Sequence, residues 1–215
     1  GNNLYQLNLI NEINKNNKYD TYVLSNKYQN KSKFIKKFYN IDIKNYKKVL
    51  NIFKKKNFSK VISIGSDVPL KTIGYINTKL NLGGLKFKDS IIATEKNSMK
   101  EFFSKIKISQ PDFKIYNGRN LLKEMRIKIP TILKETNSSG SRGIYKIENQ
   151  KKFLNIRNQI SNNKKYIVED LIIGKEFGAN IIFYKNKIQN IFIFDDIVFD
   201  NGNTNGPIGH IFPNK

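Results

Sequence analysis

The sequence contains no cysteine, a single histidine and no long apolar run in its 215 residues. The lack of cysteine excludes disulfides, thiolate catalysis and zinc–thiolate sites, and we expect a cytoplasmic protein. Because no stretch of about 18 apolar residues occurs, the sequence predicts no membrane-spanning helix and no membrane partner. Hydrophobic residues make up 39% and aromatic residues 12% of the chain, which indicates a folded core.

Acidic residues are scarce, with 17 Asp and Glu against 39 Lys and Arg, so the formal net charge is +22. A charge of this size raises nucleic acid as a partner, because Lys and Arg neutralise phosphates. The basic residues are spread over the whole chain and mixed with Asn and Ile, and runs such as Lys54–Lys56 fall on expected helix surfaces. This distribution disfavours specific nucleic-acid binding and favours attraction of small anions.

The segment 132–147 carries the clearest functional signal. An apolar strand ends at Lys134, a polar loop with two glycines follows, and a second strand covers Ile144–Ile147. Glycines let backbone N–H groups approach anionic oxygens, and Lys134 and Arg142 would add positive charge on either side. No Gly-Lys-Ser/Thr precedes a helix, so the loop is not a P-loop. The pattern predicts a strand–loop–strand flap over phosphates.

The first 88 residues alternate between helical and strand patterns, which predicts a parallel sheet with right-handed crossovers. We expect helices at 4–13, 46–56 and 69–80, and strands at 22–24 and 61–64. Ser66 or Asp67 is placed to cap the third helix. Gly1-Asn2-Asn3 directly before the first helix is typical of a turn that follows a strand. We therefore expect the chain to be a fragment that lacks an upstream strand.

From Asp89 onward the pattern changes to a mixed α+β type. Expected elements are a helix at 94–106, strands at 112–116 and 166–168, helices at 121–125 and 150–160, and a hairpin from 177–184 and 188–199. The predicted fold class is thus α/β, a parallel-sheet domain followed by an incomplete α+β domain with mixed or antiparallel sheets.

Four short motifs occur along the chain, and their order is as informative as the motifs themselves. They are Gly65-Ser66-Asp67, Thr94-Glu95-Lys96 with Met99, Ile132-Leu133-Lys134 with Ser138–Gly143, and Val168–Leu171 with Lys175-Glu176-Phe177. In this order they resemble the ATP-grasp superfamily, in particular the branch of biotin carboxylase and the carbamoyl phosphate synthase large subunit. The resemblance implies a preceding Rossmann-like domain at 1–90, the small lobe with the glycine loop at 91–170, and the start of the large lobe at 171–215.

The resemblance also implies an ATP site. Lys96 and Lys134 would contact phosphates, and the glycine loop would close over them. Glu169 and the two residues after it would face adenine, and Glu176 would bind ribose. The implied ATP-binding residues are Lys96, Lys134, Ser139, Gly140, Ser141, Arg142, Gly143, Glu169, Asp170, Leu171 and Glu176.

In this family ATP, with Mg²⁺, converts a carboxylate into an acylphosphate that an amine or similar nucleophile attacks. The implied partners are therefore a small-molecule carboxylate and an amine. The sequence leaves open whether the protein forms a homodimer. We expect the metal-binding residues downstream of Lys215 and none within the chain. The chain alone is therefore not expected to catalyse the reaction. The catalytic residue is not assigned, and its candidates are Arg142 and His210.

Two other readings stay open at this point. One is a non-catalytic ATP-grasp-like module that only binds a nucleotide, and the other is a basic nucleic-acid binder. Ordinary structural roles also compete with the site residues: Glu169 as an edge-strand carboxylate, the Gly65–Asp67 turn as a helix cap, and His210 as a structural or solvated side chain.

Overall fold

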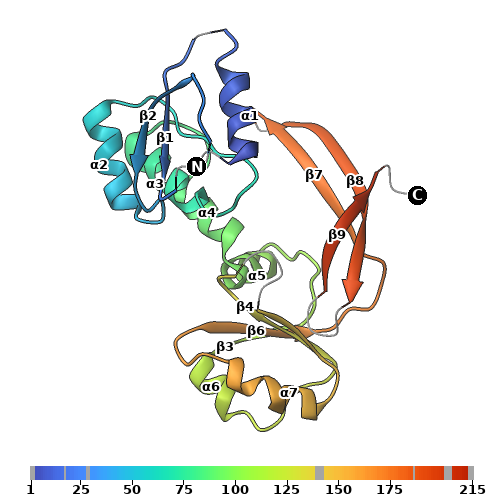
Figure 1. The fold of residues 1–215 in the computed structure, drawn as a ribbon. Coiled ribbons are helices and arrows are strands. Elements are labelled where there is room, and N and C mark those ends of the chain that lie inside the picture. Colours follow the sequence, from blue (N-terminus) through green and yellow to red (C-terminus); the bar gives the residue numbers. More distant parts are fainter. Residues whose placement is uncertain are drawn as a thin grey trace. The chain divides into compact units, whose positions relative to one another are not determined.

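The computed structural model describes residues 3–16, 18–27, 30–138, 143–185, 187–200 and 205–212. The chain divides into two compact units, Gly1–Met99 and Lys100–Lys215. Figure 1 shows the order of their helices and strands. In the part of the chain that the structure describes, no helix is both long and apolar enough to cross a membrane. The domain boundaries expected at residues 90 and 170 stay predictions.

The first unit combines helices with a parallel pair of strands. Its elements are α1 (Leu4–Ile13), β1 (Thr21–Ser25), β2 (Ile35–Asn40), α2 (Tyr46–Lys56), α3 (Leu70–Leu80) and α4 (Phe87–Thr94), and α5 (Lys96–Lys105) runs from it into the second unit. β1 and β2 pair in parallel. The sequence pattern missed β2, because Lys36 and Lys37 interrupt its apolar alternation.

Asparagines define many of the helix ends. The side chains of Asn3, Asn45, Asn117 and Asn149 each accept a hydrogen bond from the backbone N–H three residues on, at 2.8–3.1 Å. This is the usual N-cap interaction, which satisfies one of the free N–H groups of the first turn. Asn57 and Asn81 end α2 and α3 in the left-handed conformation, which asparagine tolerates better than most residues.

The strand expected at 61–64 is absent from the described sheets. Ile62 and Ile64 are instead 56% and 42% exposed. The buried Gln6 side chain donates to Ser63 Oγ at 3.1 Å and to the carbonyl oxygen of Ile64. The apolar alternation alone predicted a strand, but a strand also needs a neighbouring backbone that pairs with it.

The helix expected at 94–106 is confirmed as α5, and its start moves to Lys96 because Glu95 is extended between α4 and α5 and pairs with Lys71 at 2.5 Å. The expected cap of the third helix is wrong. Helix α3 starts after Pro69, and no side chain caps it. Ser66 Oγ accepts instead from the Val68 N–H at 3.3 Å, because the proline sets the start of the helix beyond the reach of that hydroxyl.

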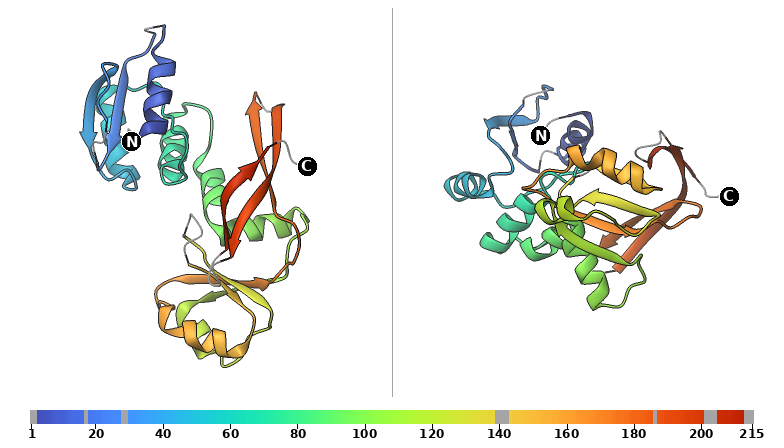
Figure 2. Two further views of the ribbon diagram at one scale, coloured as in Figure 1. Left: turned by 45° about the vertical axis from the view of Figure 1, so that its right-hand side comes forward. Right: turned by 90° about the horizontal axis from the view of Figure 1, so that it is seen from below.

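The second unit is built on antiparallel sheets. After α5 come β3 (Phe113–Asn117), α6 (Gly118–Lys123), β4 (Thr131–Glu135), β5 (Ile144–Ile147), α7 (Gln150–Ile156), η1 (Arg157–Gln159), β6 (Lys165–Asp170), β7 (Phe177–Tyr184), β8 (Lys187–Asp200) and β9 (Asn205–Ile211). One sheet has the order β3-β6-β4-β5 and another the order β7-β8-β9. Figure 2 shows β8 between β7 and β9, which agrees with the predicted hairpin.

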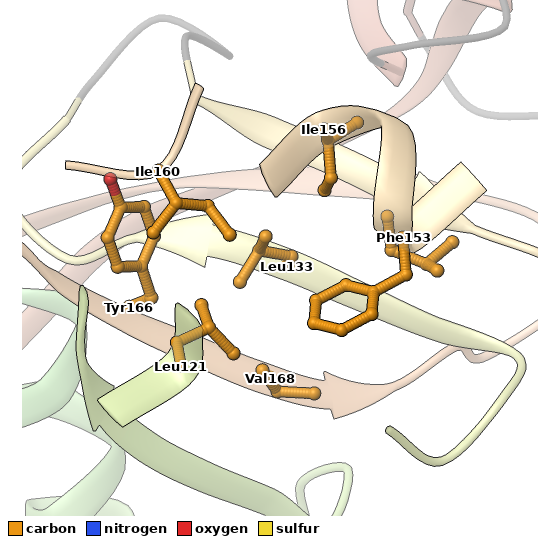
Figure 3. Close-up of a cluster of buried hydrophobic side chains, with 8 residues drawn as sticks. Leu121, Leu133, Phe153, Ile156, Ile160, Tyr166 and Val168 are labelled. Carbon is orange, nitrogen blue, oxygen red and sulfur yellow. The ribbon is translucent and has the colours of Figure 1, made fainter. Parts of the chain in front are cut away.

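Helices α6 and α7 cover one face of the four-stranded sheet. Figure 3 shows the side chains of this core pointing towards one another from both helices and from β4 and β6. The buried members are Leu121, Leu133, Ile147, Phe153, Ile156, Ile160, Tyr166 and Val168. Burial of such side chains stabilises the sheet by about 1.5–3 kcal/mol each. Since strand residues alternate, the neighbours of Leu133 and Val168 in sequence point to the opposite face.

Candidate functional site

The face of the sheet opposite the core carries two of the predicted site residues. Lys134 lies on β4 and Glu169 on β6, and the strand register places Ile132 opposite Glu169 and Lys134 opposite Ile167. Lys134 and Glu169 are therefore diagonal neighbours on one face, within reach of long side chains. Lys134 Nζ forms an ion pair with Glu169 Oε1. Strand pairing thus brings together two residues that lie 35 positions apart in the sequence.

Sequence reasoning missed a third member of this cluster. Lys100 Nζ lies 2.6 Å from Glu169 Oε2 and 5.2 Å from the centre of the Phe113 ring. Phe113 is paired with Glu169 in the β3–β6 register, so its ring lies on the same face. The available signal was the spacing of Lys100, one helical turn after Lys96. The motif resemblance named Met99 at this turn instead.

The cluster is largely buried. Glu169 is 4% exposed, and the side chains of Lys100 and Lys134 are 15% and 29% exposed. Burial alone would raise the pKa of Glu169, but the hydrogen bonds from Lys100 and Lys134 outweigh it and hold the pKa below the usual 4.5. Two ammonium groups facing one carboxylate leave an excess of one positive charge. Such a site favours an anion.

The loop after β4 begins beside this cluster. The Glu135 N–H donates to the Gly143 carbonyl at 2.9 Å, and the Thr136 N–H donates to the Lys165 carbonyl at 3.0 Å. Gly143 has a φ of 65°, a conformation that glycine adopts readily. A Cβ there would also lie 3.2 Å from the Cβ of Glu135. The glycine therefore closes the loop at its second end. The predicted residues Ser139, Gly140, Ser141 and Arg142 lie outside the described residues.

The two residues after Glu169 are held through their backbones. The Asp170 N–H donates to the Asp112 carbonyl at 3.0 Å, and the Leu171 N–H approaches the Pro130 carbonyl at 3.5 Å. The Asp170 carboxylate pairs with Lys128 at 2.5 Å. The backbone at the end of β6 is thereby fixed in position next to the cluster.

The remaining predicted residues lie elsewhere in the fold. Lys96 is the first residue of α5. Glu176 is exposed just before β7, and its carbonyl accepts from the Asp196 N–H at 3.2 Å. His210 Nδ1 is 2.7 Å from Asp196 Oδ1, and its ring packs edge-on against Phe194. His210 thus forms a polar pair across β8 and β9, and it is not part of the lysine cluster.

The described carboxylates do not fit a Mg²⁺ site. Within the described ranges, no group of three or more His, Asp or Glu side chains is arranged to hold a metal ion. Glu169 is engaged by two lysines, Asp195 pairs with Lys175 at 3.0 Å, and Asp196 pairs with His210. We therefore assign no metal ligand.

No family model matches the sequence, and no curated protein sequence matches it. In contrast, several solved structures are similar to this chain. A phosphoribosylglycinamide synthetase from Anaerococcus prevotii aligns with 84% of this chain and 46% of its own length, at 26% identity and a TM-score of 0.60. An L-amino acid ligase from Bacillus licheniformis aligns with 81% of this chain and 42% of its own, at 17% identity and a TM-score of 0.61. An N5-carboxyaminoimidazole ribonucleotide synthetase in an ADP complex aligns with 90% and 51%, at 12% identity and a TM-score of 0.67. These neighbours are ATP-grasp ligases.

The chain has part of the ATP-grasp fold. It spans about half the length of the ligases that it matches. The expectation of a mixed α/β architecture is confirmed at the level of the overall fold class. The branch of biotin carboxylase and carbamoyl phosphate synthase stays a prediction, because these three ligases are other members of the superfamily.

Proposed function

We propose that this chain is the nucleotide-binding part of an ATP-dependent ligase that activates a carboxylate. The observation that carries the proposal is the buried Lys100–Glu169–Lys134 cluster at the mouth of the β4–β5 loop. It lies in a fold whose solved neighbours are ATP-grasp ligases, some of them in complex with ADP. An excess positive charge beside a glycine-containing loop suits a polyphosphate.

In this proposal Lys134 exchanges its partner when the nucleotide binds. Lys134 turns from Glu169 to a phosphate oxygen, while Lys100 stays on Glu169 and keeps that buried carboxylate neutralised. Lys96 supplies a second phosphate contact from the start of α5. In the same assignment Gly140 to Gly143 fold over the β- and γ-phosphates, Ser139 and Ser141 are the donors, and Arg142 is a further phosphate contact.

The adenine and ribose contacts follow the same assignment. Glu169, Asp170 and Leu171 present backbone and side-chain groups to the adenine edge, and Glu176 accepts hydrogen bonds from the ribose hydroxyls. The fixed backbone at the end of β6 supports this role, because a carbonyl held in position can accept from a planar base edge without reordering.

The reaction proposed for the whole protein has two steps. A carboxylate oxygen attacks the γ-phosphorus and ADP leaves, which forms an acylphosphate. An amine then attacks the acyl carbon and inorganic phosphate leaves. In the first step the residues of this chain hold the phosphates and balance their charge. Mg²⁺ stays a prediction without an assigned ligand here, and His210 and Arg142 stay candidates for a catalytic role.

Titration calorimetry with ATP tests the proposal. Lys134→Met should weaken ATP binding about 10- to 100-fold, because it removes a charge-assisted hydrogen bond worth roughly 1.5–3 kcal/mol, and it should leave adenosine binding unchanged. Lys36→Met is the matched control, since it removes the same charge from an exposed ion pair with Asp20. Equal ATP affinity of wild type and Lys134→Met would overturn the assignment. Turnover of the whole protein with a carboxylate and an amine separates a ligase from a module that only binds.

A further inference from the structure

A network of hydrogen bonds holds the point at which the chain leaves β4 and returns to β5. The Glu135 N–H donates to the Gly143 carbonyl at 2.9 Å, and Ser138 Oγ donates to the Glu135 carbonyl at 3.2 Å. The Thr136 N–H, on a residue that is 1% exposed, donates to the Lys165 carbonyl at 3.0 Å. Glu135 therefore joins the two ends of the loop to each other, and Thr136 joins the first end to β6.

The side chain of Glu135 adds an ion pair to this network. Glu135 Oε2 lies 2.9 Å from Lys164 Nζ, and the two side chains are 19% and 51% exposed. A Cβ at Gly143 would lie 3.2 Å from the Glu135 Cβ and 3.4 Å from its Oε2. The glycine thus leaves room for the Glu135 side chain beside the second end of the loop.

The turn that carries Lys164 is itself fixed in the fold. The Lys164 N–H donates to the Ser161 carbonyl at 3.2 Å, and its carbonyl accepts from the Gly118 N–H at 2.8 Å. The Ser161 N–H donates to the hydroxyl of Tyr166, a residue that is 3% exposed, at 2.9 Å. An ion pair contributes more when its partner is already held, because less freedom is lost when the pair forms.

The side chain of Glu135 does not share a face with the proposed phosphate site. Strand residues alternate, so Glu135 lies on the face of Leu133, a core residue, while Lys134 lies on the opposite face. In the β4–β6 register Glu135 is opposite Tyr166, another core residue. Glu135 can therefore act on a bound nucleotide only through the backbone that it holds.

We propose that Glu135 is a positioning residue for nucleotide binding and that its pair with Lys164 fixes the end of β4. This inference rests on the proposed function, since it concerns the same phosphate site. Lys134 directly precedes Glu135, and Gly143 is hydrogen-bonded to it, so one ion pair helps to place both the phosphate-binding lysine and the second end of the loop. Groups held in their binding positions lose less freedom when the ligand arrives.

Two single substitutions in the full chain break the pair from opposite sides. Glu135→Gln raises the net charge by one, and Lys164→Met lowers it by one. Both weaken ATP binding if the pair acts by positioning, whereas an effect of the electric field alone would have opposite signs in the two variants. The exposed pair of Asp20 and Lys36 in the first unit provides matched controls, Asp20→Asn and Lys36→Met.

Both variants should weaken ATP binding about 3- to 5-fold in titration calorimetry and leave adenosine binding unchanged, because partly exposed pairs contribute modestly. Without nucleotide, the hydrogen-exchange protection factors of the amides of residues 135 and 136 should fall by about the same factor. The controls should change neither quantity. The double variant Glu135→Lys with Lys164→Glu forms the pair with reversed charges and should restore both.

Unchanged protection in both variants, opposite shifts of ATP affinity, or no recovery in the double variant would overturn the positioning role. If the wild type binds ATP and both variants bind it equally well, this inference fails while the proposed function stands. Absence of ATP binding by the wild type would overturn the proposed function and, with it, the role of Glu135 in the nucleotide site.

Discussion

Replacing Lys100 with methionine tests the buried cluster without touching the residue proposed to bind phosphate. Methionine retains an apolar stem against Phe113 and removes only the ammonium group that lies 2.6 Å from Glu169. A carboxylate left wholly unpaired in a protein interior would cost about 3–5 kcal/mol. Lys134 still pairs with Glu169, so the loss is that of one charge-assisted hydrogen bond. We predict that Lys100→Met lowers the free energy of unfolding of the second unit by about 2 kcal/mol, because such bonds contribute roughly 1.5–3 kcal/mol.

Amide hydrogen exchange at Leu133 and Val168 measures this loss in the four-stranded sheet itself, independently of the first unit. A change of about 2 kcal/mol makes opening of the sheet roughly 30-fold more frequent, and exchange should accelerate by the same factor. Lys128→Met is the control, because Lys128 pairs with Asp170 but is 68% exposed. The reasoning is refuted if Lys100→Met leaves exchange unchanged, or if the control accelerates it equally.

Three other substitutions test the second unit. The lowered pKa of Glu169 means that its ionised form stabilises the fold above the usual 4.5 and that this stabilisation disappears as pH falls through the folded-state pKa. The difference in urea stability between wild type and Glu169→Gln should therefore be constant from pH 7 to about 5 and shrink below 4.5. Gly118→Ala would place a Cβ 1.9 Å from the Ser161 carbonyl oxygen and should destabilise by about 3 kcal/mol or more in thermal unfolding, whereas Gly174→Ala, which meets nothing within 4 Å, should not. Leu133→Ala should cost about 2–5 kcal/mol in the same assay, and a loss below about 1 kcal/mol would contradict its place in the core.

The second unit could be predicted well because its information is local. Alternation and the glycine loop predicted strands before and after residues 136–143, and the structure has β5 at Ile144–Ile147 and β4 ending at Glu135. The hairpin of β7 and β8 followed in the same way from residue alternation. A pattern of period two specifies the face of each residue, and in the structure Lys134 points away from the core to which its neighbour Leu133 belongs.

The first unit could be predicted less well because its features depend on distant partners. The sequence of 61–64 is that of a strand, yet a strand exists only where a neighbouring backbone pairs with it, and the described sheets contain no strand paired with this segment. Lys100 was missed for a related reason. Its partner Glu169 is far away in sequence, and only the folded chain brings the two side chains to within 2.6 Å of each other.

A crystal structure of this chain with a non-hydrolysable ATP analogue tests the central claim most directly. The account predicts phosphate oxygens in hydrogen-bond contact with Lys134, the adenine edge against the backbone of residues 169–171, and Lys100 still paired with Glu169. A nucleotide bound elsewhere, or phosphates bound while Lys134 remains on Glu169, would contradict it.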